Sequence, residues 1–140
     1  MIRKQSKEWF NYISGALNVL TNGKSLSFNN ITPSKIPKEG GVYLISIKVK
    51  KLEIPYYIGR SRNLRQRLYN NHLMGPLSNA RLKKYLVKFR ECENPEKAKE
   101  FIRKHCIVRW FLEDDTRKRG AVEGYVTGVV FPKYGIYEEH

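Results

Sequence analysis

Residues 40–72 read GGVYLISIKVKKLEIPYYIGRSRNLRQRLYNNH and contain two short runs of β-forming residues, each with a tyrosine near a glycine. From Val42 to Val49 the side chains divide into two alternating sets, which is the pattern of a half-buried strand. The second run, Tyr56 to Ile58, is reached through a turn over residues 48–55 and is followed directly by Gly59. A glycine at this point lets another group come close to the backbone. The pattern predicts a hairpin of two strands.

A basic helix is expected directly after this hairpin. Ser61 is suited to cap its N-terminus. Leu64 and Leu68 are four residues apart, so both lie on one face of the helix, which we expect to be the core face. The opposite face is polar and rich in arginine and asparagine. Its members are Asn63, Arg67, Asn70 and Asn71.

The chain is strongly basic, since Lys plus Arg outnumber Asp plus Glu by 27 to 13 among 140 residues. This length suits a single domain. Basic clusters spread through segments that are expected to fold indicate a surface that meets a polyanion, and nucleic acid is the first candidate. No apolar run approaches the roughly 20 residues needed to cross a bilayer, and residues 1–10 lack a signal-peptide core. We therefore expect an intracellular protein with no membrane partner. Its expected location is the cytoplasm, at the nucleoid, or the nucleus if the cell is eukaryotic.

Hydrophobic periodicity predicts the remaining elements. An amphipathic helix over residues 4–20, with Trp9 and Phe10 in its apolar set, is expected to pack on the domain. Residues 106–112, CIVRWFL, are nearly all apolar, as in a covered strand, and Cys106 is expected to be buried. The predicted fold is a mixed α+β domain, with a small, mainly antiparallel three-stranded sheet flanked by helices. The predicted units are an N-terminal helical extension over 1–36 and a compact domain over 37–140, with further helices over 80–89, 94–104 and 116–130.

Several motifs occur in a characteristic order. Gly41-Val42-Tyr43 is followed by Tyr57-Ile58-Gly59, and Arg67 comes ten residues after the second tyrosine. These residues resemble the signature of the GIY-YIG nuclease superfamily. Glu123, ahead of an apolar run that leads to Pro132, is similar to the closing helix of that family. The resemblance extends over most of the chain.

The resemblance implies an endonuclease that hydrolyses DNA phosphodiester bonds with one Mg²⁺ or Mn²⁺ ion. It implies that Tyr43 is the general base, that Tyr57 orients water or phosphate, that Arg67 holds the scissile phosphate and that Glu123 binds the metal. Nearby arginines and a metal are expected to lower the usual tyrosine pKa of about 10. The family often has a histidine or tyrosine one helical turn after the arginine. That place is Asn71 here, so His72, one position later, is a further candidate.

Nucleic-acid contacts are expected from the basic and amide side chains around these motifs. Each candidate also has an ordinary structural explanation, because strand tyrosines are usually core residues and Glu123 can pair with Arg119 one turn earlier. The alternative function is a nucleic-acid-binding module with weak or no catalysis. Duplex or branched DNA as the target, a protein partner that supplies specificity, and the oligomeric state are left open. The expected contact residues are Arg60, Arg62, Arg65, Asn71, Lys83 and Lys84.

Overall fold

The structure is a computed structural model that describes residues 1, 3–4 and 6–135. Its strands are β1 (Leu26–Ser27), β2 (Gly41–Val49), β3 (Leu52–Ser61) and β4 (Cys106–Leu112). They form one sheet in the order β1-β4-β2-β3, and each neighbouring pair is antiparallel. The predicted α+β class with a mainly antiparallel sheet is confirmed. Three of the strands were predicted, and the fourth, β1, is a two-residue addition beside β4. The predicted turn over residues 48–55 is wrong, because β3 begins at Leu52 and only Lys50 and Lys51 form the turn.

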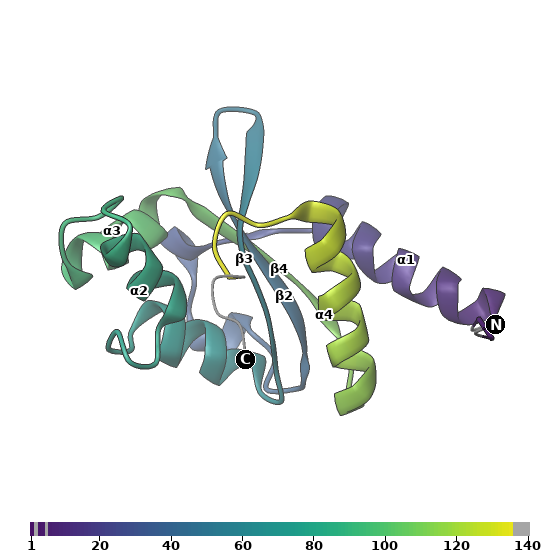
Figure 1. Cartoon of the computed structure of the whole chain (residues 1–140). Helices are drawn as coiled ribbons and strands as arrows, with labels where there is room; N and C mark the ends of the chain where they lie inside the picture. The colour runs from purple at the N-terminus through teal and green to yellow at the C-terminus, as the bar shows by residue number, and fades with distance from the viewer. Residues whose placement is uncertain (2, 5, 136–140) are drawn as a thin grey trace.

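Helices cover both faces of the sheet (Figure 1). They are α1 (Lys7–Asn22), η1 (Phe28–Asn30), η2 (Pro33–Lys35), η3 (Gln66–Leu73), α2 (Arg81–Lys88), α3 (Pro95–His105) and α4 (Thr116–Val130). On one face Val42 and Leu44 join a buried cluster with residues of α1 and α4. On the other face Tyr43 and Ile45 join a larger cluster with residues of η3, α2 and α3. Successive side chains of a strand point to opposite faces, so β2 serves both clusters.

The residues before Pro37 contribute to both clusters. α1 packs on α4 and β4, while Phe28 and Ile36 are buried in the larger cluster. α1 is amphipathic as predicted, but the expectation that Phe10 belongs to its inward face is wrong, because this side chain is 57% exposed. One residue turns a helix by about 100°, so Phe10 points away from the face that buries Leu20. The division between residues 36 and 37 stays a prediction.

A partly buried ion pair ties the β2–β3 hairpin to the rest of the fold. Arg109 of β4 donates from Nη1 and Nη2 to the two carboxylate oxygens of Glu53, at 2.8 and 3.1 Å. Its Nε donates to the carbonyl of Gly23, which follows α1, at 2.6 Å. The hydrogen bonds from Arg109 lower the pKa of Glu53 below its usual value. A two-pronged contact of this kind fixes orientation, so the base of the hairpin is held in place.

No helix in the described part of the chain is both long and apolar enough to cross a bilayer. Cys92 and Cys106 are free and buried, which confirms the expectation for Cys106. Burial raises the pKa of the Cys106 thiol to about 12, so it is a packing residue and not a nucleophile.

Candidate active site

Two tyrosines from neighbouring strands lie side by side on one face of the sheet. In the β2–β3 register Tyr43 lies opposite Gly59, and Tyr57 lies opposite Ile45. The two tyrosine rings are stacked with their centroids 6.3 Å apart. This confirms the prediction that both lie on adjacent strands and on one face. A Cβ at Gly59 would lie 2.3 Å from the hydroxyl oxygen of Tyr43, so the glycine makes room for this ring.

His72 contacts both tyrosines. Its Nε2 lies 2.7 Å from the hydroxyl oxygen of Tyr43, and its ring centroid is 5.2 Å from that of Tyr57. η3 is a π-helix, in which backbone bonds join residues five apart. His72 therefore lies one turn after Arg67 although it comes five residues later. The wider turn gives His72 the place that an ordinary α-helix would give to Asn71.

The imidazole of His72 is neutral at physiological pH. Burial, reinforced by the positive charges of Arg67, Lys83 and Arg81, lowers its pKa to about 3. Nδ1 is the one buried side-chain polar atom without a hydrogen-bond partner among the described residues. When the ring proton is on Nδ1, the hydroxyl of Tyr43 donates to Nε2.

This buried imidazole is expected to make the protein less stable in acid. An unfolded histidine titrates near pH 6.5, whereas His72 titrates at about 3. Between these values the unfolded chain binds more protons, so the free energy of unfolding falls as the pH falls, by about 1.4 kcal/mol per pH unit. The stabilisation is complete above pH ~6.5 and is lost toward pH 3. His72→Gln, which retains a group able to bond Tyr43, is expected to flatten the decline.

Urea denaturation of both proteins between about pH 7 and pH 4 measures this difference. Carboxylates titrate in both proteins, so only the difference between the two curves reports on His72. Parallel curves would show that the imidazole does not carry the effect.

Burial dominates the proton affinity of the tyrosine pair. It raises the pKa of Tyr43 well above its usual value, with Tyr57 adding to the effect and Arg67 opposing it. Among the protein's own groups, burial therefore outweighs the lowering of the pKa of Tyr43 that we expected from nearby arginines. The lowering expected from a metal stays a prediction. Tyr43 is only 1% exposed, so loss of hydration of the phenolate outweighs the favourable charge of Arg67. The charges of Arg67 and Glu123 act on both tyrosines. Four of the five predicted catalytic residues are therefore close enough to interact electrostatically.

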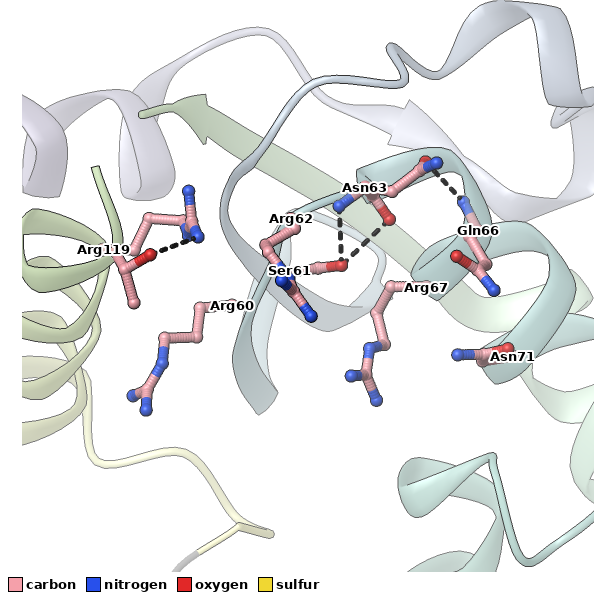
Figure 2. A pocket seen from close by; sticks show the side chains of 9 residues that line it. Arg60, Ser61, Arg62, Asn63, Gln66, Arg67, Asn71 and Arg119 are labelled. Carbon is pink, nitrogen blue, oxygen red and sulfur yellow. Dashed lines mark hydrogen bonds between the residues drawn. The ribbon is translucent and has the colours of Figure 1, made fainter. Parts of the chain in front are cut away.

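An open pocket of about 450 Å³ lies between the end of β3, η3 and the start of α4. Figure 2 shows Arg60 on the α4 side and Arg67 on the η3 side of this space, with Arg62 between them. In the described part of the chain, the guanidinium of Arg67 has no hydrogen-bond or ion-pair partner. A free guanidinium in an open basic pocket is suited to bind two oxygens of a phosphate.

The start of the basic helix differs from the predicted one. Ser61 Oγ accepts from the backbone N–H of Asn63 at 3.0 Å, which closes a short turn. Asn63 Oδ1 then accepts from the backbone N–H of Gln66 at 3.1 Å, and this bond has the geometry of an N-cap. The capping role therefore belongs to Asn63, and the helix that carries Arg67 begins later than Ser61 implied.

Glu123 of α4 is held by a residue from β3. Arg60 Nη1 donates to Glu123 Oε1 at 2.7 Å, and the two side chains are 50% and 24% exposed. Burial raises the pKa of Glu123, and Arg60 opposes this rise. The alternative partner weighed from the sequence, Arg119, is buried and donates instead to the carbonyls of Glu113 and Asp114. Glu123 of α4 thus pairs with a residue of strand β3 and not with a residue of its own helix.

The donor set around Glu123 fits one hard cation that is completed by substrate and water. No group of three or more His, Cys, Asp or Glu side chains in the described residues is arranged to hold a metal. Mg²⁺ is commonly bound by one or two carboxylates and keeps waters or phosphate oxygens as its other ligands. Arg60 bonds one oxygen of Glu123, and the second carboxylate oxygen is left for a cation. The residues fit a one-carboxylate Mg²⁺ or Mn²⁺ site and do not fit a metal centre enclosed by protein.

Most of the predicted nucleic-acid contacts face solvent. Arg60 and Arg62 are exposed and line the pocket together with the half-buried Asn71. Lys84 is exposed on α2. Arg65 is half-buried, and its Nε donates to the carbonyl of residue 36 at 2.8 Å, so part of its donor capacity is already used.

The prediction that Lys83 points outward is wrong. This side chain is 3% exposed, and its Nζ donates to the carbonyl of Gly75 at 2.9 Å. Lys83 is three residues before Leu86, so it shares the inward face of α2. Burial lowers its pKa to about 8. In this structure Lys83 supports the loop before α2 and does not offer its charge to a ligand.

Arg81, the first residue of α2, is a cation near the tyrosines that the sequence reasoning did not include in the site. After burial, its charge is the largest influence on the pKa of Tyr57, and it also acts on Tyr43 and His72. One feature of the sequence could have pointed to Arg81. The first turn of a helix favours acidic residues, yet here it carries an arginine after Ala80, which provides no side-chain cap.

No model of a known protein family and no curated protein matches the sequence. The structure is similar to that of the N-terminal GIY-YIG endonuclease domain of UvrC from Thermotoga maritima. A point mutant of that domain bound to its catalytic divalent cation is 20% identical, with 95% of this chain and 100% of that chain covered and a TM-score of 0.45. The magnesium-bound domain is 19% identical, with 94% and 100% covered and a TM-score of 0.40. The structural match thus spans nearly the whole chain at low sequence identity.

Proposed function

We propose that this protein is a Mg²⁺-dependent endonuclease that hydrolyses DNA phosphodiester bonds. The observation that carries the proposal is the convergence of four side chains, from β3, η3 and α4, on Tyr43. Tyr57 stacks beside it, His72 bonds it at 2.7 Å, and the charges of Arg67 and Glu123 both act on it. A base, a cation for the phosphate and a carboxylate for a metal are the parts that this hydrolysis needs.

Arg67 binds the non-bridging oxygens of the scissile phosphate, because its guanidinium is free and permanently charged. As a phenolate, Tyr43 takes a proton from the attacking water. The charge of Arg67 favours this phenolate against burial, and His72 with its ring proton on Nε2 donates to the phenolate oxygen. Tyr57 orients the water or the phosphate. Arg60 supplies further positive charge at the pocket.

Glu123 would hold the metal through its carboxylate. When bound, the ion would supply positive charge where negative charge develops on the phosphate and the leaving oxygen. The ion pair with Arg60 opposes the rise in the pKa of Glu123 that burial causes, and so favours the ionised carboxylate that binds a cation. A DNA substrate places the protein in the cytoplasm at the nucleoid, or in a nucleus.

A nicking assay tests this function directly. Supercoiled plasmid and short duplex, nicked and branched DNAs are incubated with the protein, with and without Mg²⁺. We expect nicked or cut product only with Mg²⁺, and none after addition of a chelator. Absence of cleavage on every substrate, together with retained binding, would favour the alternative function.

That alternative is a nucleic-acid-binding module on the same fold with weak or no catalysis. Two observations favour it: Tyr43 is 1% exposed, and one oxygen of Glu123 is already bonded to Arg60. Both functions use the same basic pocket, so binding alone does not separate them. A protein partner that selects the target is compatible with either one.

A further inference from the structure

The β2–β3 hairpin extends beyond the rest of the sheet (Figure 1). Pairing between β4 and β2 stops at Ile47, whereas β2 and β3 stay paired out to Val49 and Leu52. Residues 48–53 therefore form a two-stranded ribbon with no third strand beside it. Such a ribbon is marginally stable alone, but the bidentate contact from Arg109 holds its base.

This ribbon has one apolar face and a basic tip. Val49 and Leu52 lie opposite each other and are 47% and 62% exposed, and Ile54 on the same face is 38% exposed. The acid of the ribbon, Glu53, is neutralised by Arg109 at the base. The net charge of the projecting part is therefore positive. Its exposed ammonium groups are those of Lys48, Lys50 and Lys51.

The turn at the tip is made by Lys50 and Lys51. Lys50 has a φ of 57°, in the left-handed region, which is unfavourable for a residue with a side chain. Two-residue hairpin turns with positive φ at the first position usually have glycine there. The chain thus carries a charge at the outermost point of the hairpin at a cost in backbone energy.

β3 connects this tip to the candidate active site. It is an edge strand of the sheet, and Lys51 and Arg60 lie at its two ends. The nine steps between them correspond to about 30 Å at about 3.3 Å per residue, close to the ~34 Å of one turn of B-DNA. The middle of the edge is covered, because the backbone N–H groups of residues 133–134 donate to carbonyls of β3. That cover disfavours pairing with a strand from a partner protein.

We propose that the hairpin tip is a second contact for duplex DNA, in which Lys50 and Lys51 bind phosphates about one helical turn from a phosphate at the basic pocket that Arg60 and Arg67 line. This inference rests on the proposed function and names its substrate class: DNA with a duplex arm of at least one turn on the hairpin side of the cleavage point. A two-stranded ribbon has the dimensions of the major groove. A stiff polyanion of this length reaches the tip and the basic pocket at the same time, whereas a flat anionic membrane offers nothing to the pocket.

The double variant Lys50→Gly, Lys51→Ser removes both charges and leaves a turn sequence that suits positive φ. Its thermal stability is therefore expected to equal or exceed that of the parent. On a duplex of about 24 bp, the slope of log K against log salt is expected to fall in magnitude by about 1.8, since each lost phosphate contact removes about 0.9. The parent is expected to gain affinity as the duplex is lengthened beyond about one turn, and the variant is expected to lose this gain.

The matched control is Lys97→Ala, Lys104→Ala on α3, which removes the same charge from another element. An equal fall in slope in this control would assign the effect to net charge and overturn the proposal, as would an unchanged slope in the hairpin variant. A membrane contact would be identified instead if the parent binds phosphatidylserine vesicles and Leu52→Ser does not. In that case neither Leu52→Ser nor the hairpin double variant would change the affinity for DNA. Parent cleavage in the nicking assay reports separately on the proposed function. If the parent cleaves DNA but the hairpin variant binds DNA with an unchanged salt slope, only this inference is contradicted.

Discussion

Glu123→Gln is expected to abolish Mg²⁺-dependent cleavage while DNA affinity holds or rises slightly. Glutamine has the size of glutamate but lacks the charge that Mg²⁺ requires of its protein ligand. Arg60, which donates to Glu123 at 2.7 Å, loses its ionic partner and becomes more available to phosphate. Single-turnover cleavage rates and equilibrium binding, measured on the same duplex, separate these two effects.

A control with the same loss of charge is Glu100→Gln on α3, where the carboxylate is exposed and paired with Lys97 at 3.6 Å. This variant is expected to cleave at the parent rate. Titration with Mn²⁺ adds a readout that does not depend on turnover, because the Glu123 variant is expected to bind the ion more weakly with or without DNA. Parent-like turnover in Glu123→Gln would remove Glu123 from the metal site.

Tyr43→Phe is expected to slow cleavage by a factor on the order of 10² or more, the usual contribution of a general base. The change removes one oxygen and leaves the ring that packs over Gly59 and beside Tyr57. It also leaves Nε2 of His72 without its bond at 2.7 Å. An unsatisfied buried group costs roughly 1–3 kcal/mol, so a modest loss of stability is expected together with the loss of rate.

Tyr56→Phe separates those two consequences. Tyr56 of β3 is buried, and its hydroxyl donates at 2.8 Å to Glu91, which is not one of the candidate site residues. This variant loses the same atom and a comparable hydrogen bond, and is expected to lose stability but to keep its cleavage rate. Equal rates for the two variants, after correction for the folded fraction, would argue against Tyr43 as the base.

The local patterns of the sequence were sufficient for the elements and for part of the site. Alternation from Val42 to Val49 predicted a strand there, but the expectation that it is half-buried is wrong, because residues 41–47 are buried on both faces of the sheet. The spacing of Leu64 and Leu68 predicted the buried side of the basic helix. Both leucines are fully buried. These inferences succeed because strand and helix periods are properties of neighbouring residues. The placement of Tyr43 and Tyr57 on one face follows from the same period once the hairpin is assumed.

Contacts between distant segments were decided only by the tertiary structure. Glu123 pairs with Arg60 of β3 and not with its helical neighbour Arg119. The packing of α4 on the sheet brings Arg60 close to Glu123, and the helical periodicity of the sequence does not indicate this contact. The π-turn of η3 moves His72 under Tyr43, and burial of that tyrosine reverses the expected shift of its pKa. Hydration is lost through the whole surrounding fold, so neither its amount nor its effect on a charge can be computed from the residues beside it in the chain.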